Sequence, residues 1–210
     1  MITVEKISKK FDEAVVFDEF DYVFELGKSY ALIGPSGSGK STLLNMIGKL
    51  ESPDSGTLKI DTKALSTIKE QVYFRDYLGY LFQNYGLIDN ESVLNNLLLA
   101  FVGKKVSKAG KKSQIITALE KVGLGEIPLK RNIFSLSGGE QQRVALAKLI
   151  LKNPRIILAD EPTGALDPST GDRIADLLLE LLDETKTIVI ATHNPEVWEK
   201  CDVILDLRTV

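Results

Sequence analysis

The sequence has no apolar run long enough to cross a membrane. Its longest, LLLAFV at Leu97–Val102, is far shorter than the roughly 20 residues that a membrane-spanning helix needs. The charged start MITVEKISKK has no apolar segment after it, so it does not resemble a signal peptide. We therefore expect a chain that does not cross a membrane by itself.

The sequence also has little cysteine and no surplus of basic residues. Its one cysteine, Cys201, excludes an internal disulfide and favours a reducing compartment. Lys and Arg number 26 against 29 Asp and Glu, a formal net charge of -3, so the charge gives no reason to expect bulk binding of nucleic acid. The lysine-rich stretch Gly103–Lys112 is expected to be a solvated surface loop, with a specific anionic partner as the alternative.

Histidine occurs only once, in the stretch TIVIATHNPE at Thr187–Glu196, where an apolar strand runs into a loop. Taken alone, His193 is most simply a histidine satisfied in the protein core. A functional role depends on whether other groups at the same place need an imidazole.

Short apolar runs alternate with helical patterns, which predicts an α/β fold with a mainly parallel sheet. Strand-like runs fill residues 2–60 and return at Arg155–Ala159, Thr187–Ala191 and Asp202–Leu207. Helical patterns lie between them, at Ser92–Val102, Ser113–Val122 and Glu140–Lys152. We predict one domain over residues 1–210, in which a helical subdomain at about 84–152 interrupts an α/β core at 1–83 and 153–210.

A glycine-rich loop between a strand and a helix matches the P-loop pattern G-x-x-x-x-G-K-[ST]. Glycines let consecutive N–H groups point inward, and the N-terminus of the following helix favours an anion. Lys40 can neutralise β- and γ-phosphates, and the Ser41 hydroxyl can ligate Mg²⁺. The alternative is a glycine-rich turn that matches by chance. The predicted nucleotide-binding residues are Gly34, Pro35, Ser36, Gly37, Ser38, Gly39, Lys40, Ser41 and Thr42.

Two carboxylates follow the apolar run of RIILADEPTG. Successive side chains near a strand end diverge, so the two carboxylates can do different work. Asp160 is suited to the metal, and Glu161 is suited to a base that polarises the attacking water. Without a P-loop, such a pair is more often a helix cap or a solvated loop. The two motifs together predict a nucleoside triphosphate hydrolase.

A second glycine-based anion site lies in LSGGEQQRVALAK, Leu136–Lys148. Ser137 is placed to cap a helix that begins near Gly139, which would leave free N–H groups for an anion. An ordinary helix start explains the cap but not the glycine pair.

With this stretch the chain resembles the ATP-binding subunits of ABC transporters, in which LSGGE is the signature motif. The resemblance covers nearly the whole chain, and the motifs come in the family's order. The remaining ones are Gln83 in LGYLFQNYGL, GALD at Gly164–Asp167, and His193. The family's fold has a P-loop NTPase core with a mainly parallel sheet, an N-terminal antiparallel β subdomain and an inserted α-helical subdomain.

The resemblance implies that two copies pack head to tail around two ATP molecules with Mg²⁺. Each ATP would lie between the P-loop of one copy and the signature of the other, so that signature residues contact the γ-phosphate. The residues implied to contact ATP from the signature are Ser137, Gly138, Gly139 and Glu140. Asp167 would lie at the dimer interface.

The family pattern also implies roles for single residues. Gln83 would sense Mg²⁺ and the attacking water, and His193 would reach the γ-phosphate. An aromatic residue normally stacks on adenine, and Phe11 is the candidate, with a core position at a strand end as the alternative. A transmembrane permease subunit would dock near Tyr85, Leu87 and Ile88, unless these apolar residues belong to the core.

From these features we expect a peripheral ATPase on the cytoplasmic face of the cell membrane. TGALD and FQNYGLI most resemble the ATPases of lipoprotein, macrolide and bacteriocin or peptide exporters, and the short stretch after His193 leads us to expect no C-terminal regulatory domain. Lys148 stands where many relatives have arginine.

A soluble ABC ATPase of DNA repair or translation is the alternative, but the sequence has neither a sustained heptad stretch nor a second cassette. A kinase would not need the signature, and no guanine-reading N-K-x-D motif is present.

Overall fold

The computed structural model describes residues 1–164 and 166–208. The chain divides into two units, which are described separately. The first consists of Met1–Leu78, Arg155–Glu161 and the segment from Leu182 onward, and the second consists of Gly79–Pro154 and Pro162–Leu181. None of the helices in the described ranges combines the length and the apolar character that spanning a bilayer requires.

An antiparallel sheet forms the N-terminal part of the first unit. Its strand order is β2-β1-β4-β5. The apolar side chains Ile2, Val4 and Ile7 of β1 are buried, which is the one-sided pattern of an antiparallel sheet with a solvated face. The strands are β1 (Ile2–Phe11), β2 (Ala14–Phe24), β4 (Ser55–Ile60) and β5 (Lys63–Ala64).

A parallel sheet in the first unit carries the predicted residues Asp160 and Glu161 at the end of one strand and His193 after the end of another. Its strands lie in the order β7-β8-β3-β9, and each neighbouring pair is parallel. The four apolar residues of β7 and all five residues of β8 are buried, as expected of strands covered on both faces. The strands are β3 (Lys28–Ile33), β7 (Ile156–Asp160), β8 (Thr187–Ala191) and β9 (Val203–Asp206).

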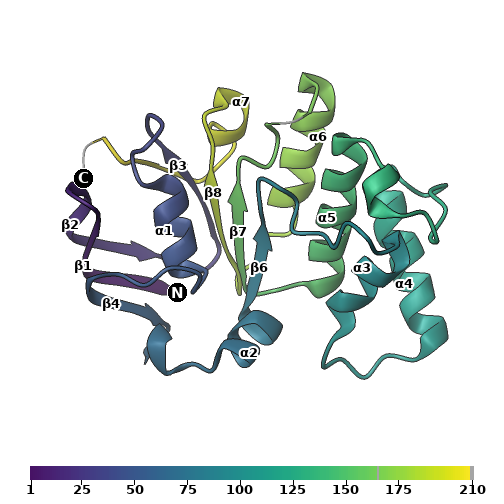
Figure 1. Ribbon diagram of the computed structural model, residues 1–210, viewed down its shortest axis with the longest axis horizontal. Coiled ribbons are helices and arrows are strands. Elements are labelled where there is room, and N and C mark those ends of the chain that lie inside the picture. The colour runs from purple at the N-terminus through teal and green to yellow at the C-terminus, as the bar shows by residue number, and fades with distance from the viewer. Residues whose placement is uncertain (165, 209–210) are drawn as a thin grey trace. The chain divides into compact units, whose positions relative to one another are not determined.

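Helix α1 (Lys40–Ile47) packs against β7 and β8 in the same unit (Figure 1). It buries Leu43, Leu44, Met46 and Ile47. This packing fixes the start of α1 beside the carboxyl ends of the parallel strands, where ligands of such sheets gather. The unit also contains η1 (Leu65–Thr67), α2 (Glu70–Val72), the π-helical turn η2 (Tyr73–Tyr77) and α7 (Pro195–Trp198).

The second unit is mainly helical. Strand β6 (Leu78–Leu81) leads into it, and α5 packs against α3, α4 and α6 (Figure 1). The helices are α3 (Val93–Leu98), η3 (Leu99–Phe101), α4 (Lys108–Lys121), η4 (Ile133–Ser135), α5 (Gly138–Lys152) and α6 (Pro168–Leu179).

The predicted α/β fold class is confirmed, and one helix boundary was wrong. Helix α4 begins at Lys108 and not near Ser113, because the Ser107 side chain accepts a hydrogen bond from Gly110 N–H at 3.1 Å and caps the helix there. Half of the lysine-rich stretch expected to be a loop is therefore helical.

Candidate active site

The glycine-rich loop joins β3 to α1. Gly34 and Gly39 have φ angles of 143° and 92°, which L side chains rarely adopt. A Cβ at Gly34 would come within 2.6 Å of Ser38 Oγ, and one at Gly39 within 2.6 Å of Val16 Cγ1. Glycine at both positions lets the backbone curl tightly, as a phosphate-binding loop requires.

Lys40 is the first residue of α1 and reaches back across the loop. Its Nζ donates to the carbonyl oxygens of Gly34 at 2.7 Å and Pro35 at 3.0 Å. Within the described residues, the buried Ser38 hydroxyl oxygen has no hydrogen-bond partner. The loop thus presents an ammonium group and an unsatisfied hydroxyl, which suits a phosphate ligand.

Asp160, the last residue of β7, meets the helix that starts at Lys40. Burial raises the pKa of Asp160 and the neighbouring Glu161 adds to this rise, while a hydrogen bond with the Ser41 side chain and the charge of Lys40 oppose it. Mg²⁺ prefers oxygen ligands and is usually held by one or two protein groups plus substrate phosphates. A carboxylate and a hydroxyl in contact at this point fit that ion. The described residues contain no group of three or more His, Cys, Asp or Glu side chains placed to hold a metal.

Glu161 directly follows β7 and contacts the end of β8. Its φ of 48° turns the chain so that its N–H donates to the Ala191 carbonyl at 2.9 Å. His193 Nδ1 lies 2.9 Å from Glu161 Oε1, and the Thr192 hydroxyl lies 3.4 Å from Oε2. His193 and Glu161 thus emerge at the same edge of the sheet, where the carboxyl ends of the parallel strands β7 and β8 meet.

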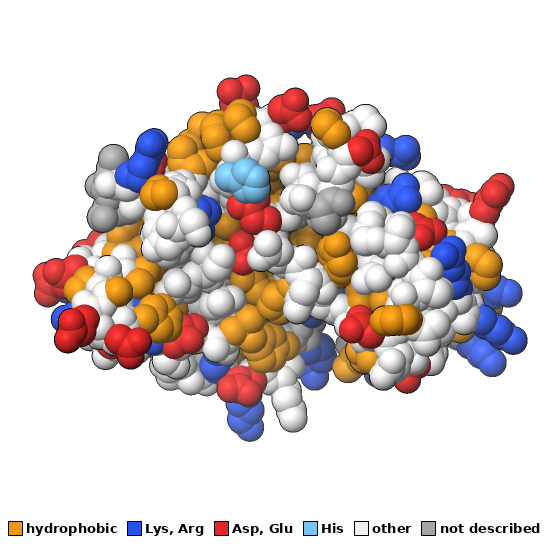
Figure 2. All heavy atoms as spheres, turned by 45° about the horizontal axis from the view of Figure 1, so that its top comes forward, with side chains coloured by type: hydrophobic (Ala, Val, Ile, Leu, Met, Phe, Trp, Pro, Cys, Tyr) orange, Lys and Arg blue, Asp and Glu red, His pale blue; other side chains and the backbone are white. Residues whose placement is uncertain are grey.

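His193 is a surface side chain. It is 75% exposed, whereas the Glu161 side chain is 17% exposed. The single pale-blue side chain in Figure 2 lies at the surface against acidic side chains. The interpretation of His193 as a histidine satisfied in the core is therefore wrong, and its role at the phosphate stays a prediction.

Phe11 ends β1 and is also at the surface. Its side chain is 46% exposed, and Lys9 Nζ lies 5.1 Å from the centre of its ring. The alternative of a core phenylalanine is wrong. An exposed ring is what stacking on adenine needs, and the stacking itself stays a prediction.

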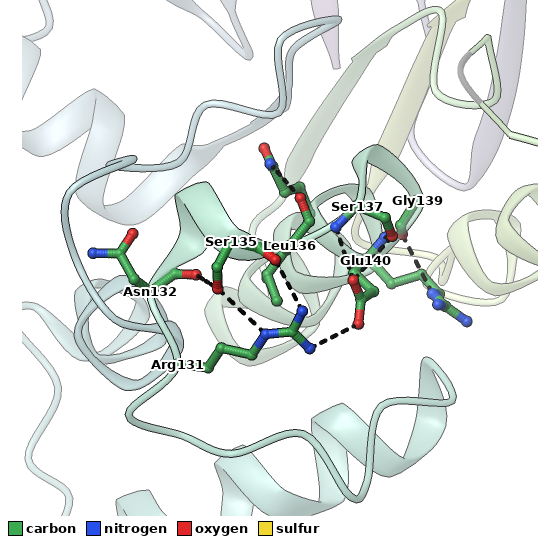
Figure 3. Close-up of polar contacts among 9 residues, drawn as sticks. Arg131, Asn132, Ser135, Leu136, Ser137, Gly139 and Glu140 are labelled. Carbon is green, nitrogen blue, oxygen red and sulfur yellow. Dashed lines mark hydrogen bonds and ion pairs between the residues drawn. The ribbon is translucent and has the colours of Figure 1, made fainter.

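In the second unit, the start of α5 is closed by a capping box. Ser137 Oγ accepts from Glu140 N–H at 3.3 Å, and Glu140 Oε2 accepts from Ser137 N–H at 2.8 Å. Arg131 Nη1 lies 3.2 Å from Glu140 Oε1, and its Nη2 donates to the Ser135 carbonyl at 2.9 Å (Figure 3). The hydrogen bond from Ser137 N–H, and next that from its hydroxyl, lower the pKa of Glu140 although burial opposes this. The predicted cap by Ser137 is confirmed, with the helix starting at Gly138.

The glycines that open α5 lie close to other side chains of the second unit. A Cβ at Gly138 would come within 2.9 Å of Tyr85 Oη, and one at Gly139 within 3.1 Å of Leu166 Cδ2. Tyr85 itself has a φ of 67°. Glycine therefore allows the loop after β6 to approach the start of α5 closely.

The other predicted residues of the second unit are exposed or half-buried. Gln83 is exposed in the turn after β6. Ile88 is 49% exposed, and its N–H donates to the buried side chain of Asn96 at 2.7 Å, so its backbone is anchored while its side chain remains accessible. Leu87 is half-buried. The alternative that this segment belongs wholly to the core is wrong for Ile88.

Asp167 caps α6. Hydrogen bonds from the Ser169 hydroxyl and from Thr170 hold the pKa of its carboxyl well below the usual range. The side chain is exposed. Ala165 of the predicted GALD motif lies outside the described residues.

Sequence reasoning missed Thr192 and Arg131. Thr192 is fully buried and directly precedes His193. Its position next to a candidate catalytic residue is the signal in the sequence that could have identified it. Arg131 precedes the signature by several residues, and no local pattern marks it.

Comparison with known proteins identifies the family. The profile of the ABC transporter family matches residues 17–164. An uncharacterised ABC transporter ATP-binding protein of Bacillus subtilis, YvrO, is 38% identical over 99% of this chain and 93% of its own length. The lipoprotein-releasing system ATP-binding protein LolD of Treponema denticola is 36% identical over 97% of this chain and 93% of its own.

A solved structure agrees with these matches. The ATP-binding cassette MJ0796, determined as a dimer in a post-hydrolysis state with ADP and Pi, superimposes with a TM-score of 0.88 at 34% identity, over 98% of this chain and 94% of that one. The relatives are transporter proteins, so an ATPase of DNA repair or translation is not favoured. The chain thus belongs to the ABC transporter family, as one of its ATP-binding and ATP-hydrolysing subunits.

Proposed function

We propose that the chain forms an ATP-dependent homodimer that hydrolyses ATP to drive a transmembrane permease. The observation that carries the proposal is the edge of the parallel sheet in one unit. Asp160, Glu161 and His193 lie there at or just beyond strand ends, and Lys40 at the start of α1 interacts with Asp160. The dimeric state of MJ0796 supports the assembly.

The first unit would bind the triphosphate. The curled loop from Gly34 and the ammonium group of Lys40 would hold the phosphates, with Phe11 stacked on adenine. Ser41, Asp160 and Gln83 would hold Mg²⁺, whose charge offsets that of the phosphates when the ion is bound.

Two side chains would act on the attacking water. The carboxylate of Glu161 would accept a proton from it, and His193 would hold it in line by donating to the γ-phosphate. The 2.9 Å contact between their side chains supports a shared task.

The second unit would complete the site of the other copy. The first N–H groups of a helix have no partner within that helix, and Glu140 N–H is satisfied by Ser137. Gly138 and Gly139 would then donate to the γ-phosphate held by Lys40 of the partner subunit, with Asp167 nearby at the dimer interface. We propose that Glu140 acts through the cap, since its carboxylate already accepts from Ser137 and Arg131.

The chain would work as a single domain with its helical subdomain at about 84–152. The permease would dock at Tyr85, Leu87 and Ile88, with the exposed Ile88 as the accessible part. This would place the protein on the cytoplasmic face of the membrane. The likeness to LolD supports an exporter of lipoproteins or peptides, including bacteriocins.

Co-purification and dimerisation test the proposal. Antibody capture of the native chain from detergent-solubilised membranes should bring down a multi-span protein. Size-exclusion chromatography of the isolated chain should show a dimer with ATP and Mg²⁺ when hydrolysis is blocked. A chain that captures no membrane protein and stays monomeric with ATP contradicts the proposal.

A further inference from the structure

The end of β8 contacts Glu161 through three consecutive residues. The Ala191 carbonyl accepts from Glu161 N–H at 2.9 Å. The hydroxyl of Thr192 lies 3.4 Å from Glu161 Oε2, and His193 Nδ1 lies 2.9 Å from Oε1. Each oxygen of the carboxylate therefore faces a different residue of one strand end.

Thr192 and His193 differ in their surroundings. Thr192 is 0% exposed, while the side chain of His193 is 75% exposed. The Thr192 N–H donates to the Leu32 carbonyl at 3.2 Å, which ties it to β3. Its hydroxyl oxygen accepts from Asn194 N–H at 3.1 Å, so its one hydrogen is available for Glu161.

We propose that Thr192 is a positioning residue for ATP hydrolysis, whose buried hydroxyl fixes Oε2 of Glu161 so that the carboxylate faces the attacking water. The proposal rests on the proposed role of Glu161 as the base. The terminal torsion of a glutamate side chain has a broad range, so the rotamer alone does not set the plane of the carboxylate. A hydrogen bond from a buried hydroxyl group, which water does not reach, can set the plane of the carboxylate. A carboxylate offers about four lone-pair positions, so one bond at Oε2 leaves others for the water.

Three substitutions separate positioning from packing. Thr192→Val removes the hydroxyl at similar volume, and Thr192→Ser keeps the hydroxyl. Thr187→Val is the matched control. Thr187 is as buried as Thr192 and begins β8, the strand that Thr192 follows, and its hydroxyl donates to the Glu25 carbonyl at 2.9 Å, away from Glu161.

We expect Thr192→Val to lower kcat at least about tenfold, the lower end for a hydrogen bond to a charged group, with KM for ATP unchanged. Thr192→Ser and Thr187→Val should keep both kcat and KM. If Thr192→Val does not fold, Thr192→Ala gives the same comparison.

The same changes in a Glu161→Gln chain show which claim fails. Thr192→Val should not lower the residual rate there, since it acts through the carboxylate. Normal turnover of Glu161→Gln alone would contradict the proposed base and leave Thr192 with nothing to position. If Glu161→Gln is inactive, three results would overturn the Thr192 proposal. The first is a normal kcat in Thr192→Val, and the second is an equal loss of kcat in Thr192→Ser. The third is a full further loss of kcat when Thr192→Val is added to Glu161→Gln.

Discussion

Glu161 combines an unusual backbone angle with a partly buried side chain. A non-glycine residue in the left-handed region costs of order 1–3 kcal/mol and persists where its surroundings hold it. Here the Ala191 carbonyl, Thr192 and His193 hold the residue that adopts a φ of 48°. The strain turns a strand-end carboxylate toward the neighbouring strand.

We expect Glu161→Gln to bind ATP and to lose at least the roughly 10²–10⁴-fold that a positioned base contributes. Without hydrolysis it should accumulate as an ATP-bound dimer. Phosphate release and size-exclusion chromatography measure the two effects. Lys40→Ala is the comparison, because it should weaken nucleotide binding itself, and hydrolysis by Glu161→Gln at the normal rate would refute the assignment.

His193→Ala should fold normally and hydrolyse ATP at least tenfold more slowly. An exposed side chain contributes little packing, so the melting temperature should stay near that of the unchanged chain. A hydrogen bond that tightens on a charged group in the transition state supports a change of roughly 10–150-fold. Melting, ATP-dependent dimerisation and turnover should be measured side by side, and normal turnover of the folded variant would rule out the catalytic role.

At the scale of an element, the cap of α5 has a matched counterpart in the cap of α4. Ser137 and Ser107 each accept a hydrogen bond from the backbone N–H three residues on, at 3.3 Å and 3.1 Å. Replacing either serine by alanine should lower the free energy of unfolding by about 1 kcal/mol. Only Ser137→Ala should also weaken ATP-dependent dimerisation, measured in the Glu161→Gln chain. Equal dimerisation of the two variants would limit Ser137 to a structural role.

The sequence predicted the elements whose signals are local. Each of these signals spans only a few residues, so spacing alone identifies it. They are the P-loop, the apolar run before Asp160 and the serine before the glycine pair. It did not predict the contact of Arg131 with Glu140 or that of Thr192 with Glu161, because these depend on how separate segments pack. The sequence also could not predict whether Phe11 and His193 are exposed. The end of a strand has the same sequence pattern whether its last residues and those that follow are buried or exposed.

At the scale of the whole molecule, coupling to a permease should depend on the segment after Gln83. We expect Leu87→Glu to abolish ATP-driven transport in the assembled transporter and to spare basal ATPase activity, because a charge on a docking surface repels an apolar partner helix. Ile116→Glu is the control, since Ile116 is 37% exposed on α4 of the same unit. Unfolding of Leu87→Glu would instead place Leu87 in the core.

The rarity of histidine has a practical consequence. Since His193 is the single histidine of the chain and its exposed ring lies against Glu161, all histidine ring signals in a proton magnetic resonance spectrum come from this one side chain. Those signals report from the edge of the sheet that carries the proposed catalytic residues, without isotope labelling or assignment of the other residues. Addition of nucleotide, closure of the dimer and loss of the Glu161 carboxylate could each be followed at that one ring, in the unmodified protein.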